Sequence, residues 1–138
     1  TERGAAIVLI THNLGVVAEF CETVQVMYAG RFVESAPADH IFDSSLHPYT
    51  DALINSMPGP DQLEADRLPF IPGYPPDLSR LPPGCSFEPR CSHGHGEKTC
   101  LERAPYPEAL EVGGHSVLVE CHFVGDRLQR PDRFDPSQ

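Results

Sequence analysis

The chain has 138 residues, 15 of them proline, and carries a formal net charge of −10. A chain this acidic repels phosphate backbones, which argues against a nucleic-acid partner. Because no run of about eighteen apolar residues occurs, the sequence also excludes a membrane-spanning helix.

The first predicted element is the apolar run of residues 5–10 (AAIVLI). It is too short for a helix, and half of it is β-branched, which is typical of a strand buried on both faces of a parallel sheet. Such a strand needs neighbouring strands and covering helices, and too few follow it. We therefore expect the neighbours upstream and interpret the chain as a fragment. A strand without neighbours can also pair with a second copy, so self-association is a possible outcome.

A helix and a hairpin are predicted next. Asn13 can cap a short helix whose apolar side chains recur at helical spacing up to Cys21, which we interpret as a small buried hydrophobe. Residues 23–28 and 31–34 predict two antiparallel strands joined by an Ala-Gly turn.

Two prolines then predict the starts of two short helices. Pro37 opens the first helix, which directs Ile41 and Phe42 inward. Pro48 opens the second helix, one face of which carries Tyr49, Ala52, Leu53 and Ser56.

The rest of the chain is rich in proline and cysteine. Proline lacks a backbone donor, so residues 58–83 are predicted to be an extended linker rather than a sheet or a long helix. This linker separates a first unit, residues 1–57, from a final unit, residues 84–138. Within the final unit, residues 116–123 alternate as a strand does, with one face made by Val117, Val119, Cys121 and Phe123.

Four of the five cysteines fall in this final unit, at the spacing C-x5-C-x8-C-x20-C: Cys85, Cys91, Cys100 and Cys121. No secretory signal is visible, so we interpret them first as thiols or metal ligands and second as disulfides. Four thiolates can bind one zinc ion or an iron–sulfur cluster. The lack of close C-x2–4-C pairs favours the larger [4Fe–4S] cluster. Zinc stays open because three histidines can act as substitute ligands: His93, His95 and His122. Free or disulfide-bonded cysteines are the third alternative.

Few residues of the sequence are candidates for nucleotide binding. His12 follows residues 5–10 directly, at the carboxyl end of the predicted strand, where parallel α/β sheets bind ligands. A histidine there can donate to a phosphate, although a lone histidine at a strand end is more commonly structural. No G-x-x-x-x-G-K-[ST] phosphate loop occurs, so we expect the chain alone neither to bind nor to hydrolyse ATP.

Five segments resemble one protein family. Residues 9–18 (LITHNLGVVA) are similar to the switch-histidine segment of the ABC ATPases of peptide importers, and residues 26–34 (VMYAGRFVE) to the hairpin that follows it. Residues 46–50 (LHPYT) resemble the His-Pro-Tyr signature that opens the oligopeptide/dipeptide C-terminal extension. Two later segments, residues 71–76 (IPGYPP) and 83–91 (PGCSFEPRC), resemble later parts of that extension.

The resemblance implies an α/β fold: the C-terminal end of an ABC ATPase nucleotide-binding domain, followed by a loop-rich, cysteine-ligated extension. It implies a parent subunit that couples ATP hydrolysis to oligopeptide or dipeptide import with ATP and Mg²⁺, and in which His12 contacts the γ-phosphate. As in some members, Cys85, Cys91, Cys100 and Cys121 would ligate a [4Fe–4S] cluster. The implied partners are a second ABC ATPase subunit and transmembrane permeases, which places the parent peripherally on the cytoplasmic face of the membrane.

The sequence departs from the family pattern in two places. Asn13 replaces the usual Asp after His12, and either residue can cap a helix. The interval between Cys91 and Cys100 is longer than usual and contains a His-Gly-His-Gly run. A second interpretation makes the chain, or residues 57–138, a metal-stabilised interaction or regulatory module without catalysis.

Overall fold

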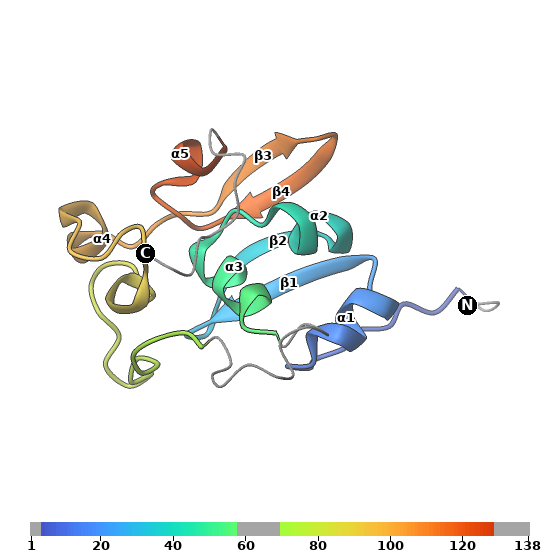
Figure 1. Cartoon of the computed structure of the whole chain (residues 1–138), viewed down its shortest axis with the longest axis horizontal. Coiled ribbons are helices and arrows are strands. Elements are labelled where there is room, and N and C mark those ends of the chain that lie inside the picture. The colour runs from blue at the N-terminus through green and yellow to red at the C-terminus, as the bar shows by residue number, and fades with distance from the viewer. Residues whose placement is uncertain (1–3, 58–69, 129–138) are drawn as a thin grey trace, which may run out of the picture.

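The computed structural model describes residues 4–57 and 70–128 and is built around one antiparallel sheet (Figure 1). The sheet has four strands in the order β1-β2-β4-β3. These are β1 (Thr23–Tyr28), β2 (Arg31–Pro37), β3 (Glu108–Val112) and β4 (His115–Val119). The helices are α1 (Leu14–Phe20), α2 (Ala38–Ser44), α3 (Pro48–Asn55), the 3-10 helix η2 (Glu88–Arg90), α4 (Lys98–Glu102) and α5 (Val124–Leu128).

Two hairpins make up the sheet, and the turn of each uses residues with positive φ. Ala29 and Gly30, at φ 49° and 79°, close β1 onto β2. Gly113 and Gly114, at φ 59° and 83°, close β3 onto β4, as two-residue hairpin turns require. The hairpins meet where Glu34 of β2 pairs with β4. Residues from the early and the late parts of the chain therefore share one sheet.

One face of the sheet is buried. Along β1 the side chains of Val24, Val26 and Tyr28 are buried while those between them are exposed, which is the pattern of a sheet covered on one side. Helices α2 and α3 lie across the sheet in Figure 1, and Ile41 of α2 is 1% exposed. Full burial of an isoleucine side chain stabilises the fold by about 1.5–3 kcal/mol relative to its exposure.

The predictions for residues 13–55 are largely confirmed. Asn13 caps α1, because its Oδ1 accepts the N–H groups of Gly15 and Val16 at 3.1 and 3.3 Å. Strand β1 has the predicted bounds, and β2 runs three residues beyond the predicted end. Helices α2 and α3 start at the predicted prolines, Pro37 as the N-cap and Pro48 as the first residue.

The predicted buried strand at residues 5–10 is wrong for this chain. These residues have no regular structure, and Ile7, Val8 and Ile10 are 79%, 88% and 95% exposed. A strand of a parallel sheet needs hydrogen-bonded neighbours on its edges, and no strand within the described residues pairs with it. The apolar run therefore stays uncovered, next to α1 at one end of the molecule (Figure 1).

Three details of the other elements also differ from prediction. Helix α3 buries Pro48, Thr50 and Asp51 most deeply, because its N-terminal turn is the part that meets the core. Strand β4 ends at Val119, so Cys121 lies beyond it, immediately before a turn at His122 and Phe123. Strand β3 was not predicted from the sequence, since only one face of it is partly buried.

The predicted linker is described only in part. Residues 58–69 lie outside the described residues, and residues 70–83 contain neither helix nor strand. Of the helices in the described ranges, none is both long and apolar enough to cross a bilayer.

Candidate functional site

Four cysteines gather at the end of the molecule opposite α1. Cys85 and Cys91 lie on either side of η2, Cys100 lies in α4, and Cys121 follows β4 (Figure 1). The backbone N–H of Cys85 donates to the carbonyl oxygen of Cys100 at 2.8 Å, which joins the chain before η2 to α4. None of these thiols is in a disulfide. We refer to them as the four-cysteine group.

Two glycines allow the loops of this group to approach closely. A Cβ at Gly84 would lie 2.0 Å from the carbonyl oxygen of Cys100, closer than real side chains come. A Cβ at Gly94 would lie 2.8 Å from Sγ of Cys100 and 3.7 Å from Sγ of Cys91. The missing side chain of Gly94 therefore leaves free the space beside two sulfurs.

Backbone N–H groups point at three of the sulfurs. Gly94 donates to Sγ of Cys91 at 3.2 Å, and Phe123 donates to Sγ of Cys121 at 3.5 Å. Cys85 accepts from two further backbone N–H groups at the start of η2. Such donors favour the thiolate over the thiol and tune metal-bound sulfur in proteins.

The thiols also act on one another electrostatically. Burial, followed by the charges of Cys85, Cys91 and Cys121, raises the pKa of Cys100 to about 12. Burial raises the pKa of Cys121 to about 11, with Cys91 and Cys85 adding to the rise. Burial likewise raises the pKa of Cys85. Four thiolates in this space would repel one another unless a positive charge is bound among them.

A metal site also requires that the ligand side chains lie close together. Within the described ranges, no three His, Cys, Asp or Glu side chains lie close enough together to hold a metal ion. The structure of the described residues therefore supports neither the predicted zinc site nor the predicted [4Fe–4S] cluster.

The three histidines predicted as substitute zinc ligands all have other contacts. Nη1 of Arg127 lies 3.5 Å from Nε2 of His93, and a guanidinium can only donate, so this nitrogen accepts. Nε2 of His122 lies 2.9 Å from a backbone carbonyl oxygen, and Nδ1 of His95 lies 3.3 Å from the Glu88 carboxylate. One ring nitrogen of each histidine is therefore engaged with another group.

The His-Pro-Tyr motif is hydrogen bonded to the segment that carries Cys121. His47 is 2% exposed, and its Nδ1 caps α3 by accepting the N–H of Tyr49 at 3.0 Å. Its ring also hydrogen bonds to the backbone of Glu120, the residue before Cys121. Burial lowers the pKa of His47 to about 3. The ring is therefore neutral, so one nitrogen accepts while the other donates.

Phe87 connects the motif to Cys85 through aromatic packing. It is 2% exposed, and its ring centroid lies 5.2 Å from that of Tyr28, 5.9 Å from His47 and 5.3 Å from Tyr49. The contact with Tyr28 is edge-to-face, a geometry that contributes about 0.5–1.5 kcal/mol beyond burial. Phe87 thereby fixes the turn that follows Cys85.

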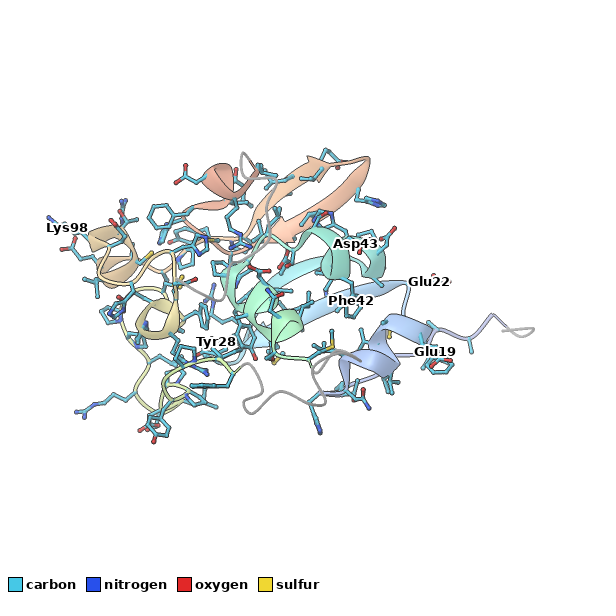
Figure 2. The ribbon with its side chains drawn as sticks, viewed as in Figure 1. Glu19, Glu22, Tyr28, Phe42, Asp43 and Lys98 are labelled. Atoms are coloured by element: carbon cyan, nitrogen blue, oxygen red, sulfur yellow. The ribbon has the colours of Figure 1, made fainter. Side chains whose placement is uncertain are left out.

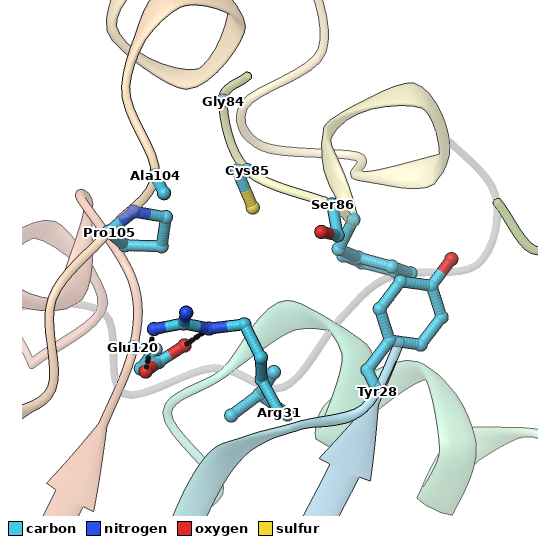
Figure 3. Close-up of a pocket in the computed structure, with 10 residues that line it drawn as sticks. Tyr28, Arg31, Gly84, Cys85, Ser86, Ala104, Pro105 and Glu120 are labelled. Carbon is cyan, nitrogen blue, oxygen red and sulfur yellow. Dashed lines mark hydrogen bonds and ion pairs between the residues drawn. The ribbon is translucent and has the colours of Figure 1, made fainter. Parts of the chain in front are cut away.

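A bidentate ion pair and a small pocket lie beside Cys85 (Figure 3). Nε and Nη2 of Arg31 donate to the two carboxylate oxygens of Glu120 at 3.0 and 2.7 Å. The pocket has a volume of about 30 Å³ and is lined by Arg31, Glu120 and Cys85 among others. It has room for about one water molecule, not for an organic ligand.

A second ion pair is more deeply buried. Nη2 of Arg127 in α5 lies 3.1 Å from Oδ2 of Asp51 in α3, with side chains 11% and 10% exposed. Sequence reasoning missed this pair and also Glu34, which is 1% exposed and accepts the N–H groups of Leu46 and His47. The one available signal was the position of these charges within otherwise apolar or helical segments.

His12, the other predicted site residue, is not brought to the four-cysteine group. It is exposed and precedes α1. Figure 2 shows how far apart these regions are: Glu19 of α1 and Lys98 of α4 lie at opposite ends of the molecule. The described chain therefore contains two separate candidate sites rather than one.

Comparison with known proteins identifies the class. Residues 33–100 match the family described as the C-terminal region of the oligopeptide/dipeptide transporter. Oligopeptide transport ATP-binding protein OppD of Salmonella typhimurium is 51% identical over 112 residues, 81% of this chain and 32% of that protein. OppD of Mycobacterium tuberculosis is 51% identical over 109 residues, 79% of this chain and 17% of that protein. A Brucella abortus relative, an ATP-binding protein named for peptide import, is 47% identical over 115 residues, 83% of this chain and 33% of that protein.

The chain therefore carries the C-terminal region of the oligopeptide/dipeptide transporter family, and over about four fifths of its length it is similar to proteins named as ATP-binding proteins of peptide transport. It spans about a third or less of the length of these relatives.

Proposed function

We propose that this chain works as part of an ATP-binding subunit that couples ATP hydrolysis to the import of oligopeptides or dipeptides. The observation that carries the proposal is the identity of about half of the aligned residues to OppD, over four fifths of the chain. The whole subunit would use ATP and Mg²⁺. It would lie peripherally at the cytoplasmic face of the membrane, with a second ABC ATPase subunit and transmembrane permeases.

Within that subunit we assign His12 to the γ-phosphate of ATP. Its exposed position after the apolar run supports the assignment, because nothing in the described chain covers the side chain. In a full-length subunit with its partners, His12→Ala should lower ATP hydrolysis at least about 100-fold, within the range for a positioned proton-transfer or phosphate-contacting group. Nucleotide binding should persist. Hydrolysis unchanged by the substitution would refute this role.

The isolated chain gives a complementary test. It lacks a phosphate loop, so titration with Mg²⁺ and ATP in a calorimeter should show no saturable binding. Saturable binding would contradict the assignment of nucleotide binding to another part of the subunit.

We further propose that Cys85, Cys91, Cys100 and Cys121 hold a [4Fe–4S] cluster. Support comes from four thiols that act on one another electrostatically, from backbone N–H donors to three sulfurs, and from the free space beside Gly94. When bound, the cluster would supply one-electron redox chemistry and folding energy. The protein's own part is to position the sulfurs and to shield them from water.

Anaerobic purification distinguishes the metal alternatives. The cluster predicts a brown protein with iron and labile sulfide, and Cys91→Ser should abolish both. Cys21→Ser is the matched control, since Cys21 is the C-cap of α1, and the substitution should leave the iron content unchanged. A colourless protein with one zinc ion would contradict the cluster and favour a zinc site in which histidines act as ligands beside the cysteines.

Two further assignments remain proposals. We retain the division into residues 1–57, 58–83 and 84–138 as units of the subunit. We also propose that the exposed residues 5–10 allow the isolated chain to self-associate. The double substitution Ile7→Lys and Ile10→Lys should then yield a monomer in sedimentation velocity, whereas a wild-type chain that is already monomeric would refute self-association.

A further inference from the structure

Two histidines from distant parts of the chain meet at the turn end of the β3–β4 hairpin. His40 belongs to α2, and His115 is the first residue of β4, directly after the turn at Gly113 and Gly114. Their ring centroids lie 6.1 Å apart, and Nε2 of His115 lies 3.8 Å from Oδ2 of Asp39, also in α2. The turn end of the hairpin therefore contacts α2 through ionisable side chains.

His40 is the buried member of this contact. It is 5% exposed, and among the described residues its Nε2 has no hydrogen-bond partner. A proton there would place a positive charge inside the fold without an acceptor, which is costly. Burial, and then the charge of His115, lower the pKa of His40 below its ordinary value of 6.5, while Asp39 raises it in part. His40 is therefore uncharged at neutral pH.

The other elements packed on α2 offer no carboxylate to a protonated His40. Strand β1 carries no charged side chain, and Glu19 of α1 is exposed. The buried carboxylate of Glu34 in β2 is occupied by the N–H groups of Leu46 and His47. Within the described residues, the charges that act on His40 are thus those of the hairpin contact itself.

Main-chain pairing holds the hairpin to the rest of the sheet only at its far end. In the described ranges, β4 pairs with β2 at Leu118 and Val119, whereas His115 pairs with Val112 of its own hairpin. Strand β3 is an edge strand. Because an isolated two-stranded hairpin is at best marginally stable in water, a turn end released from α2 should lose its pairing.

We propose that the His40–His115 contact is acid-sensitive: it holds the turn end of the β3–β4 hairpin on α2 at neutral pH and releases it in mild acid. The opened state exposes His40, which then titrates near its ordinary pKa and binds more protons than the closed state. Closure is therefore favoured above about pH 6.5 and weakened as the pH falls through that value.

The His115–Asp39 pair does not reverse this direction. A proton on His115 attracts Asp39, but the two side chains are 38% and 65% exposed, so water screens the attraction. The same proton repels a second one on His40, whose ring is largely shielded from water. Mild acid therefore strengthens an exposed contact slightly and opposes a buried one.

Hydrogen exchange of the full chain, corrected for the intrinsic pH dependence of exchange, measures the opening. Between about pH 7.5 and about pH 5.5, the opening constant of the β3 and β4 amides should rise several-fold, and by at most about tenfold. The amides of β1 and β2 are the internal reference, since they report unfolding of the rest of the sheet, including any effect of His47.

Three variants assign the effect. His40→Phe keeps a ring but cannot take up a proton, so the rise relative to the reference should disappear. His115→Gln removes the neighbouring charge and should make the rise smaller. His12→Gln is the matched control, since His12 is exposed and precedes α1, and it should behave as wild type.

A hairpin-specific rise that His40→Phe abolishes supports the inference. Opening that does not change with pH, or a rise that persists in His40→Phe, overturns it. Should His40→Phe fail to fold, His115→Gln decides: a smaller rise than in wild type supports the inference, and an equal rise overturns it.

Discussion

The carboxylate of Glu34 accepts the backbone N–H of His47 at 3.0 Å, and that of Leu46 at a shorter distance of 2.6 Å. Glu34 is 1% exposed and belongs to β2, whereas His47 is the N-cap of α3. The contact places a negative charge at the positive end of the helix, where it is favoured by the helix dipole. Sheet and helix are thereby joined, and the ring of His47 is itself hydrogen bonded to the backbone of Glu120, the residue that precedes Cys121.

Replacement of Glu34 by leucine should be strongly destabilising. It would leave the buried N–H groups of Leu46 and His47 without an acceptor, at about 1–3 kcal/mol each. Glu34→Gln keeps one acceptor oxygen and should cost less. Chemical denaturation measures both changes, with Glu111→Gln on the exposed side of β3 as a control expected to stay within about 0.5 kcal/mol. Equal stability of Glu34→Leu and wild type would contradict the role of this contact.

Acid should destabilise the fold through His47. Its pKa is lowered by burial from 6.5 to about 3, so the folded state binds fewer protons than the unfolded state between these values. Stability from this residue is complete above pH 6.5 and is lost as the pH falls, by about 2 kcal/mol between pH 7.5 and pH 5. Burial raises the pKa of Glu34, which acts in the opposite sense.

Comparison of wild type with His47→Gln separates the effect of His47 on stability from that of Glu34. Denaturation curves of wild type and His47→Gln at about pH 7.5 and about pH 5 should converge as the pH falls, because only the wild type carries the histidine penalty. A constant stability difference across that range would show that His47 does not stay neutral in the folded chain.

Two glycine substitutions should prevent assembly of the four-cysteine group. Gly84→Ala places a methyl group 2.0 Å from a backbone oxygen of Cys100, and Gly94→Ala places one 2.8 Å from its sulfur. Overpacking of this kind costs about 1–3 kcal/mol or more. Gly125→Ala in α5 meets nothing within 4 Å and should be neutral or slightly stabilising. Melting temperature and iron content together test this, and wild-type values for Gly84→Ala would rule it out.

Arg90 should hold the loop before Cys85 against the core. Its guanidinium donates to the carbonyl oxygens of Pro72 and Ile71 at 2.9 and 3.1 Å, and to the hydroxyl of Tyr28 at 3.3 Å. A lysine cannot reproduce this forked set of contacts. Limited proteolysis should therefore cut residues 70–83 several times faster in Arg90→Lys than in wild type. Arg80→Lys serves as the exposed control, and identical cleavage rates in all three proteins would refute the role.

Local patterns predicted the first half of the fold well. Asn13, the Ala-Gly turn, Pro37 and Pro48 each act within a few residues, so their effects on the backbone are visible in the sequence. The exposed run at residues 5–10 shows the limit of such reasoning. Its composition is that of a buried strand, but burial depends on partner strands that the described chain does not provide.

The four cysteines stay a prediction as ligands, and the residues that surround them in the fold were not predicted. Cysteine spacing led to the choice of Cys85, Cys91, Cys100 and Cys121, and in the structure these four thiols raise one another's pKa. The pairing of β2 with β4, which carries Cys121 to the others, joins residues far apart in sequence and leaves no local signal. The partners of Arg127 likewise become apparent only when α3 and α5 are packed together.

The most direct test of the account is the iron and labile sulfide content of the chain purified without oxygen. We predict about four of each per chain, lost together when any member of the four-cysteine group becomes serine and retained in Cys21→Ser. Protein that folds, protects its cysteines from alkylation and yet contains neither iron nor sulfide would contradict the account.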